Sequence, residues 1–229
     1  MEVLFDKNIA QSYDRWAETP QGRIAYGLEG EILLSLANLS VGQRILEVGC
    51  RTGAHILLFQ RKGFNVAGVD VSTPMLRVAR QKLGEKVLLC LGDAGNLPFT
   101  GKSFDSVALI TTLEFIPDPE RAIREALRVS RGKVLLGVLN KYSFLGMKRR
   151  LVAKFRPSIY NRARFYSIWE LRKLVTEAVP EAMVDWKSVL VLPMSCLPYF
   201  RGLERRLSFR KNPLGAFLGV RVKLRGEMR

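Results

Sequence analysis

Residues 45–53, with the sequence ILEVGCRTG, constrain the fold of this chain more than any other stretch. The short apolar run 44–48 is followed by a turn that contains Gly49 and Gly53, so the sequence predicts a buried strand that leads into a helix. Glu47 then lies near the carboxyl end of the strand, which is where open α/β sheets bind ligands. Backbone N–H groups of such a turn are free for a ligand, and a carboxylate beside them can accept hydrogen bonds from amino or hydroxyl groups.

The turn resembles the first motif of class I S-adenosylmethionine-dependent methyltransferases, close to the type 11 and ubiquinone-menaquinone methyltransferases. In that motif an acid, one spacer and alternating glycines wrap the methionyl part of the cofactor. Glu47, Gly49 and Gly53 match it, whereas Arg51 stands where the family usually has glycine. The dinucleotide pattern G-x-G-x-x-G would need two further glycines, where the chain has Arg51 and Ala54, so an oxidoreductase is the weaker interpretation.

Alternating apolar and amphipathic segments after the turn predict a parallel sheet. We expect strands at residues 65–69, 86–91, 106–110 and 133–139, and helices at residues 54–62, 74–82 and 119–129. Pro74 and Pro119 suit a first helical turn, and Ser72 and Asp118 before them can serve as N-caps. This repeated unit indicates a Rossmann-like α/β fold with right-handed crossovers and helices on both faces.

Two acids follow at the ends of the next two strands. Asp70 lies 17 residues after Gly53, where a carboxylate can accept hydrogen bonds from both ribose hydroxyls of an adenosyl group, although it could instead cap the next helix. Asp93, within Gly92-Asp93-Ala94, resembles the family's aspartate that accepts from the adenine amino group. Three such features in order, at three consecutive strand ends, are more specific than any one of them.

The resemblance implies S-adenosylmethionine as the cofactor and assigns further residues to its site. Met75 would pack beside the adenine, and Tyr13, in the segment YDRW, would belong to a lid that closes over the cofactor. Tyr13 and Trp16 could equally pack the first helix onto the sheet. The expected cofactor contacts are Tyr13, Glu47, Gly49, Cys50, Arg51, Gly53, Asp70, Val71, Met75, Asp93, Ala94 and Thr111.

Composition excludes several classes of protein. The cysteines at 50, 90 and 196 are far apart and odd in number, which indicates a reducing compartment, and we expect the cytoplasm. No apolar run approaches 18 residues, and the mixed, acidic N-terminus is unlike a secretion signal. His55 is the only histidine, so we expect neither a metal site nor a Ser-His-Asp triad, and we expect His55 to be a surface or semi-buried residue.

The fourth strand is expected to deliver acceptor-site residues. Some family members carry histidine after this strand, but this chain has Leu113, Glu114 and Phe115 there. Thr111 and Leu113 would form part of the wall, and Glu114 would be either a base or a polar group on a loop. If the acceptor must lose a proton, the candidates are Tyr13, Glu114 and Tyr160.

Basic charge is concentrated in the second half of the chain. Residues 1–140 carry 17 basic and 15 acidic side chains, and residues 141–229 carry 20 basic and 6 acidic. Within the insert 141–166, apolar residues recur at helical spacing, with basic residues on the other faces: Phe144, Met147, Leu151 and Phe155. Such a helix could lie on an anionic membrane, bind a phosphate-rich partner such as nucleic acid, or pack its stripe onto the domain and leave its charges in water.

We expect one domain over residues 1–229. Its parts are a helical lid (1–40, with helices near 8–16 and 22–37), a cofactor-binding core (41–140), the basic insert (141–166) and the end of the sheet (167–229). In the last part we expect a helix at 167–175, strands at 184–192 and 215–222, and a loop or lid at 195–213. The family resemblance implies seven strands, the last of them antiparallel.

These features predict an enzyme of class EC 2.1.1 that moves a methyl group from S-adenosylmethionine to a small-molecule acceptor, lipid-like or anionic. Peripheral association with an anionic membrane is one further expectation, and an RNA-binding methyltransferase is a weaker alternative. A cofactor-binding protein with weak or lost activity is another alternative, because Arg51 replaces a turn glycine. That replacement would cost about 1 kcal/mol if the position needs a left-handed backbone, although the guanidinium could also pair with the cofactor's carboxylate.

Overall fold

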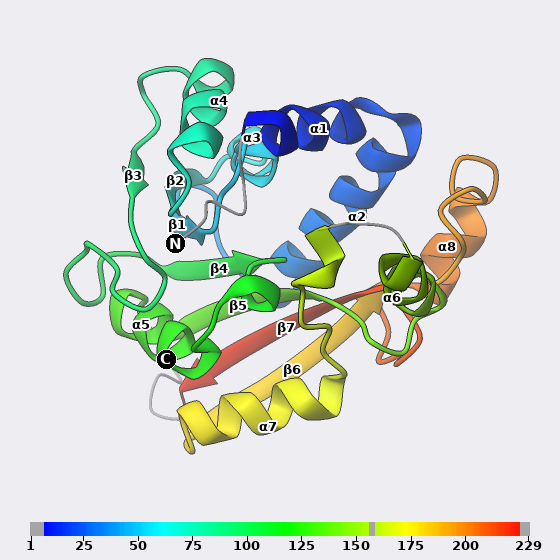
Figure 1. Ribbon diagram of the computed structural model, residues 1–229. Helices are drawn as coiled ribbons and strands as arrows, with labels where there is room; N and C mark the ends of the chain where they lie inside the picture. Colours follow the sequence, from blue (N-terminus) through cyan, green and yellow to red (C-terminus); the bar gives the residue numbers. More distant parts are fainter. Residues whose placement is uncertain (1–6, 156–158, 225–229) are drawn as a thin grey trace.

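The computed structural model describes residues 7–155 and 159–224, which form one seven-stranded sheet with helices on both faces (Figure 1). Along the sheet the strands follow the order β3-β2-β1-β4-β5-β7-β6. They are β1 (Arg44–Val48), β2 (Asn65–Asp70), β3 (Leu89–Leu91), β4 (Ser106–Ile110), β5 (Lys133–Leu139), β6 (Ala182–Val189) and β7 (Phe217–Leu224). Strands β1 to β5 pair in parallel, whereas β7 is antiparallel to both β5 and β6. The expected Rossmann-like sheet with an antiparallel last strand is therefore confirmed.

The order of the strands reverses at β1, which pairs with β2 on one side and β4 on the other. Val48 lies opposite Val69 of β2 and Leu109 of β4, so the carboxyl ends of these three strands lie side by side. In an open α/β sheet, such a reversal point leaves a crevice for a ligand. The glycine turn begins there.

Helices cover the sheet in two layers, each with its own apolar core. Helices α5 and α7 pack on one face, and α2 and α3 pack on the other (Figure 1). The helices are α1 (Lys7–Glu18), α2 (Pro20–Ala37), α3 (Ala54–Arg61), α4 (Thr73–Leu83), α5 (Pro119–Val129), α6 (Phe144–Phe155), α7 (Ile168–Ala178) and α8 (Arg201–Leu207), with 3-10 turns η1 (Leu113–Phe115) and η2 (Ile159–Asn161). None of the helices described here is both long and apolar enough to cross a membrane.

The expected helix caps are present. The Ser72 side chain accepts a hydrogen bond from the Met75 N–H at the start of α4, and Asp118 accepts one from the Arg121 N–H at the start of α5. Each helix has proline in its first turn, where the missing N–H removes no helical hydrogen bond. Local sequence therefore fixes where these two helices begin.

The segment 195–213 differs from the expected loop, because it contains helix α8. Buried Glu204 of α8 accepts hydrogen bonds from the backbone N–H groups of Val191 (3.0 Å) and Leu192 (2.9 Å). These N–H groups would otherwise continue the strand ladder. Strand β6 consequently ends at Val189, three residues before the predicted end. The third strand is also shorter than predicted and covers Leu89–Leu91 only.

Helix α6 contradicts one of the three expectations for the basic insert. Its apolar stripe does not pack onto the domain, since Phe144, Leu151 and Phe155 are 62%, 59% and 80% exposed. The opposite face of the helix is buried and consists of small residues, Gly146 and Ala153. A Cβ atom at Gly146 would lie 2.1 Å from the Asn140 carbonyl oxygen, so only the small face lets the helix approach this closely.

Candidate cofactor and acceptor sites

The glycine turn after β1 requires a left-handed backbone at three positions, Gly49 (φ 72°), Arg51 (φ 50°) and Gly53 (φ 76°). Glycine adopts this conformation without penalty, whereas arginine at such a position costs about 1 kcal/mol. At Gly49 a Cβ atom would lie 2.4 Å from the Thr112 side chain. The backbone N–H of Gly49 donates to the carbonyl oxygen of Val69 (2.7 Å), which ties the turn to β2.

Asp70 joins the ends of β1 and β2. One of its carboxylate oxygens accepts from the Arg51 backbone N–H and the other from the Ser72 N–H, both at 2.8 Å. Burial raises the pKa of Asp70, and these two hydrogen bonds oppose the increase.

A cavity of about 410 Å³, the strand-end cavity, opens over the carboxyl ends of β1, β2 and β4. Its lining includes both of the acids that follow β2 and β3, backbone of the glycine turn and the residue after β4. The predicted cofactor residues in this lining are Gly49, Arg51, Asp70, Val71, Asp93, Ala94 and Thr111. Residues from four separate segments of the chain thus line one cavity.

Five other predicted cofactor residues lie outside that lining. Glu47 and Met75 are fully buried, and Cys50 is buried in the apolar core between the sheet and α2 and α3. Gly53 forms the N-cap of α3, and Tyr13 lines a different cavity. Their contacts with the cofactor stay predictions.

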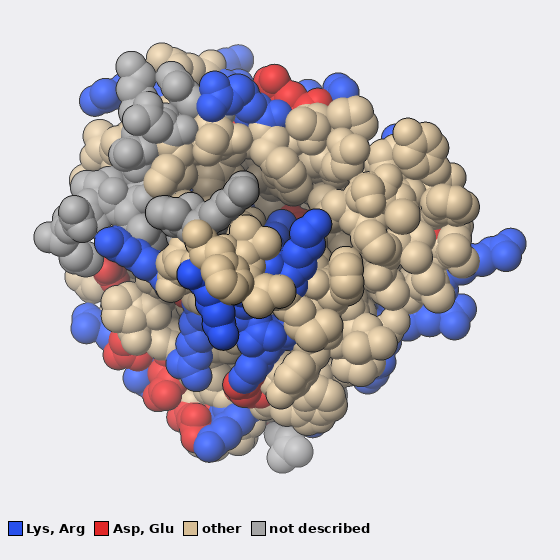
Figure 2. Space-filling view, turned by 45° about the vertical axis from the view of Figure 1, so that its right-hand side comes forward, with Lys and Arg blue, Asp and Glu red and all other residues tan. Residues whose placement is uncertain are grey.

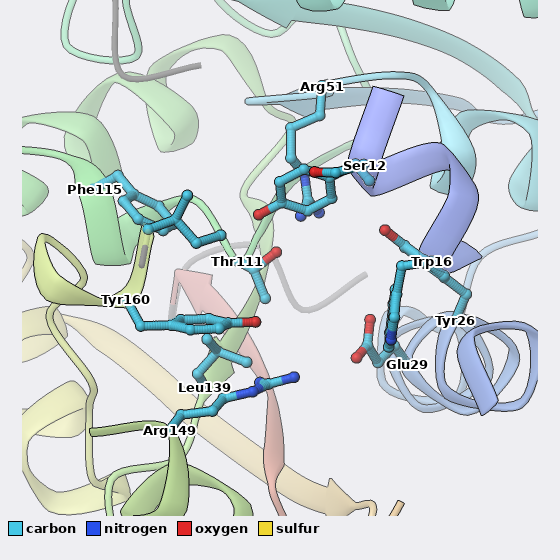
Figure 3. A pocket seen from close by; sticks show the side chains of 12 residues that line it. Ser12, Trp16, Tyr26, Glu29, Arg51, Thr111, Phe115, Leu139, Arg149 and Tyr160 are labelled. Atoms are coloured by element: carbon cyan, nitrogen blue, oxygen red, sulfur yellow. The ribbon is translucent and has the colours of Figure 1, made fainter. Parts of the chain in front are cut away.

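The second cavity, which we call the aromatic cavity, has a volume of about 200 Å³ and is bordered by aromatic rings from several parts of the chain (Figure 3). Tyr13 and Trp16 come from α1, Tyr26 comes from α2, and Tyr160 comes from η2. The carboxylate of Glu29 and the guanidinium of Arg149 also line it. The cavity therefore combines an apolar wall with charged side chains of both signs.

The two cavities share three lining residues, Arg51, Thr111 and Phe115. Thr111 has a left-handed backbone (φ 46°), and its buried hydroxyl has no hydrogen-bond partner within the described part of the chain. Arg51 donates a hydrogen bond to the Ile110 carbonyl oxygen (3.2 Å), and its guanidinium lies 5.2 Å from the centre of the Tyr13 ring. These contacts hold the guanidinium at the junction of the cavities.

Three buried titratable groups lie behind this junction. His55 is 3.5 Å from Glu29 and 3.7 Å from Glu47, and neither separation is a hydrogen bond. Burial lowers the pKa of His55, so its imidazole is neutral at pH 7. Burial also raises the pKa of Glu47 to about 8, and the positive charge of Arg51 opposes this increase.

The expectation that His55 is a surface or semi-buried residue is therefore wrong. The residue is 1% exposed, because α3 turns this side chain toward α2, where the Tyr26 ring lies 4.8 Å away. Tyr26 and Glu29 are site residues that the sequence reading missed. The available indication for Glu29 was its place in a largely apolar helical segment, LEGEILL, which also contains Glu31.

Comparisons with known proteins agree with this geometry. Residues 46–136 match a family described as Methyltransferase domain. Uncharacterized protein MJ1123 of Methanocaldococcus jannaschii is 36% identical over 177 residues, which cover 76% of this chain and 79% of MJ1123. The structure of a Thermotoga maritima protein, described as an SAM-dependent methyltransferase and possible histamine N-methyltransferase, has a TM-score of 0.75 and 28% identity, covering 96% of this chain and 97% of its own.

This chain belongs to the class I S-adenosylmethionine-dependent methyltransferases. Phosphatidylethanolamine N-methyltransferase of Cereibacter sphaeroides is a further relative, 32% identical over 145 residues. That match covers 56% of this chain and 66% of the relative, so the chain spans slightly less than two thirds of that enzyme.

The residues of this methyltransferase fit its cofactor, S-adenosylmethionine. The hydroxyl of Thr111, which lines both cavities, is buried without a hydrogen-bond partner in the described ranges, so it remains free for a polar group of the ligand. Asp70 lines the strand-end cavity, where a carboxylate is an acceptor for the hydroxyl groups of a ligand. Arg51 forms no ion pair with a described carboxylate within 4.0 Å, which leaves its charge free for the carboxylate of a ligand.

Two of the three candidate bases of the methyltransferase lie in one cavity, and the third lies elsewhere. Tyr13 and Tyr160 line the aromatic cavity, and the Arg149 guanidinium lies 4.8 Å from the centre of the Tyr160 ring. Glu114 lines neither cavity. It is buried in η1, where its carboxylate accepts a hydrogen bond from the Leu139 backbone N–H (2.7 Å), and burial raises its pKa to about 7. Glu114 thus ties η1 to β5.

Proposed function

We propose that this methyltransferase transfers the methyl group of S-adenosylmethionine to a small-molecule acceptor seated in the aromatic cavity. The observation that carries the proposal is the shared border of the two cavities at Arg51, Thr111 and Phe115. A cofactor in one cavity and an acceptor in the other would meet at this border. Methyl transfer needs such an arrangement, because the reacting atoms must be held close together and in line.

In this proposal the strand-end cavity holds the cofactor. Asp70 accepts hydrogen bonds from its hydroxyl groups, Arg51 pairs with its carboxylate, and Asp93 and Ala94 border its base. S-adenosylmethionine supplies an activated methyl group on a sulfonium. The protein's own contribution is to orient the acceptor and to keep water out, and the rings of Tyr13 and Trp16 cover the aromatic cavity for this purpose.

The lining of the aromatic cavity supports an acceptor that carries both an apolar and an anionic part. Side chains of Trp16, Tyr160, Arg149 and Glu29 point toward the same space (Figure 3). Arg149 fits an anionic group, the rings fit an apolar body, and Glu29 can accept from an N–H or O–H group. One relative is named for N-methylating phosphatidylethanolamine, which is consistent with a lipid-like acceptor.

A proton released by the acceptor would go to a group that lines the aromatic cavity. Tyr13 and Tyr160, the two candidates from the sequence, meet this condition, and Glu29 with His55 behind it adds a third route. Glu114 does not meet it. Neither the comparisons nor the geometry adds support for an inactive cofactor-binding protein or for an RNA-binding methyltransferase.

Trp16→Ala tests the proposal, with Trp169→Ala as the matched control, because Trp16 lines the aromatic cavity and Trp169 is exposed elsewhere. Each protein is incubated with methyl-labelled S-adenosylmethionine and small-molecule or lipid extracts, and the label in extracted products is counted. We expect Trp16→Ala to lower transfer by at least about tenfold, through loss of acceptor positioning, while S-adenosylhomocysteine binding changes little. Equal transfer by both variants would contradict an acceptor site in this cavity.

A further inference from the structure

The outward face of α6 combines exposed apolar side chains with cations. Along one side of this helix lie Phe144, Met147, Leu151, Val152 and Phe155, all exposed. Lys148 and Lys154 flank them, and neither lysine forms an ion pair with a described carboxylate. We call these seven residues the α6 face. A monomeric soluble protein rarely leaves such an apolar stripe open to water, so the stripe indicates a binding surface.

The segment around the start of α8 also combines exposed apolar side chains with cations. Tyr199, Phe200 and Leu203 are exposed, with Arg201 and Arg206 beside them. Both α6 and this segment follow strands that run in the same direction, β5 and β6, since each of these strands is antiparallel to β7. They therefore leave the sheet at the same end, which is also the end where the two cavities open. Figure 2 shows basic side chains gathered beside a broad uncharged area on this side of the molecule.

We propose that the α6 face docks on an anionic membrane surface, with its apolar side chains in the interface and its lysines at the lipid headgroups. A helix with aromatic and aliphatic residues on one face, bordered by lysines, binds bilayers by apolar burial together with attraction to anionic lipid. Other occupants fit the surface less well. A second copy would bring two chains of net charge +16 together, and nucleic acid would leave Leu151 and Val152 without an apolar partner.

With the α6 face on the membrane, the proposed acceptor site would lie close to the bilayer surface. Arg149 lines the aromatic cavity and belongs to α6, so the docking helix is also part of the cavity wall. This role of the docking rests on the proposed function, because docking would deliver an acceptor with an anionic headgroup from the bilayer to the aromatic cavity. The docking itself does not depend on methyl transfer and is measured separately.

Vesicle flotation with the full chain tests the docking. The probes are phosphatidylcholine vesicles with and without a phosphatidylglycerol fraction, at low and high salt. We expect the native protein to float with the anionic vesicles at low salt and to stay behind with neutral ones. Phe144→Ser with Leu151→Ser and, separately, Lys148→Glu with Lys154→Glu should each reduce the partition coefficient by about tenfold or more.

Matched variants separate the α6 face from general effects of hydrophobicity and charge. Leu88→Ser with Leu91→Ser removes two equally exposed apolar residues near β3, and Lys62→Glu with Lys86→Glu changes the net charge by the same amount elsewhere. Both controls should float like the native protein. Equal losses in the controls, or no flotation of the native protein, would overturn the proposal.

Two further readouts make the outcome specific. Binding of an RNA oligonucleotide that depends on Lys148 and Lys154, without any vesicle binding, would overturn the proposed membrane docking and indicate that the α6 face binds nucleic acid. S-adenosylhomocysteine binding and methyl transfer to soluble acceptors are measured on the same variants and should not change. If these activities fail in the native protein while flotation succeeds, the proposed function is wrong and the docking surface stands.

Discussion

His55 lies 3.5 Å from the carboxylate of Glu29, which places the chain's only histidine directly behind the wall of the aromatic cavity. On its other side, 3.7 Å away, is Glu47 of β1. A buried series of three titratable side chains therefore connects the aromatic cavity with the strand that precedes the glycine turn. Burial disfavours the charged forms of His55 and Glu47, so the protonation of these two groups is sensitive to what binds nearby.

The imidazole of His55 is expected to stay neutral below its usual pKa of 6.5, because burial opposes its charge more than Glu29 favours it. With one histidine in the chain, its NMR signals are unambiguous across a pH titration. Glu29→Gln should lower the pKa of His55 further, since a favourable neighbour is lost. The folded protein then loses stability as pH falls below 6.5, because the unfolded chain takes up the proton first. A measured pKa of 6.5 or higher would contradict the buried environment.

Glu47 gives the opposite dependence on pH. Its pKa is about 8 in the folded protein and 4.5 without burial, so the folded state holds a proton that the unfolded state lacks between these values. As pH rises through this window, the native free energy of unfolding should fall relative to Glu47→Gln by up to about 1.4 kcal/mol per pH unit. Thermal unfolding at pH 6 to 9 measures the difference. Glu85→Gln, at an exposed site, is the control and should show no such trend. A pH-independent difference for Glu47→Gln would place its carboxyl group in a charged, solvated state.

Arg51 is expected to strengthen cofactor binding. Its guanidinium lines the strand-end cavity and pairs with no carboxylate in the described residues, so it is free to bind the cofactor's own carboxylate. Calorimetric titration of S-adenosylmethionine should show binding about tenfold or more weaker in Arg51→Gly, because a hydrogen-bonded charge is lost. Arg51→Lys keeps the charge, so its affinity for S-adenosylmethionine should lie between those of the native protein and Arg51→Gly. Tighter binding by Arg51→Gly would show that the side chain blocks the site.

Glu204 should matter for stability and for no step of the reaction. Its buried carboxylate accepts from the N–H groups of Val191 and Leu192, and Glu204→Ala would leave both donors unsatisfied. We expect the free energy of unfolding to fall by about 3 kcal/mol in chemical denaturation, while S-adenosylhomocysteine affinity stays unchanged. Glu181→Ala, at an exposed position, is the control. A loss below about 0.5 kcal/mol for Glu204→Ala would contradict this anchoring role.

Much of the fold follows from local sequence. The bounds of β1, β4, β5 and α5 are as predicted, because apolar runs of these lengths are bordered by glycine, proline or capping residues. The end of β6 is different, since it depends on Glu204, which is twelve or more residues away and takes the N–H groups that would extend the strand. No local pattern contains that information.

The same distinction applies to the site and to α6. Gly49, Arg51 and Asp70 lie in or next to a motif at strand ends, so their meeting in one cavity was predictable. Glu29 and Tyr26 reach the site only because α2 packs against α3, a contact without a local pattern. The spacing of apolar residues in α6 predicted an apolar stripe but did not show whether the stripe faces the domain or the solvent. The small residues on the opposite face determine this, since only that face packs closely against the domain.

Titration of S-adenosylhomocysteine into the native protein, Val71→Asp and Leu88→Asp tests most directly whether the strand-end cavity holds the cofactor. Val71 and Leu88 are both exposed apolar residues, but only Val71 lines that cavity. A carboxylate at position 71 would have to lose its water when the ligand binds, which is unfavourable. We predict one ligand per native chain, binding at least about tenfold weaker in Val71→Asp, and native affinity in Leu88→Asp. Absence of binding to the native protein, or equal affinities for all three proteins, would contradict the assignment.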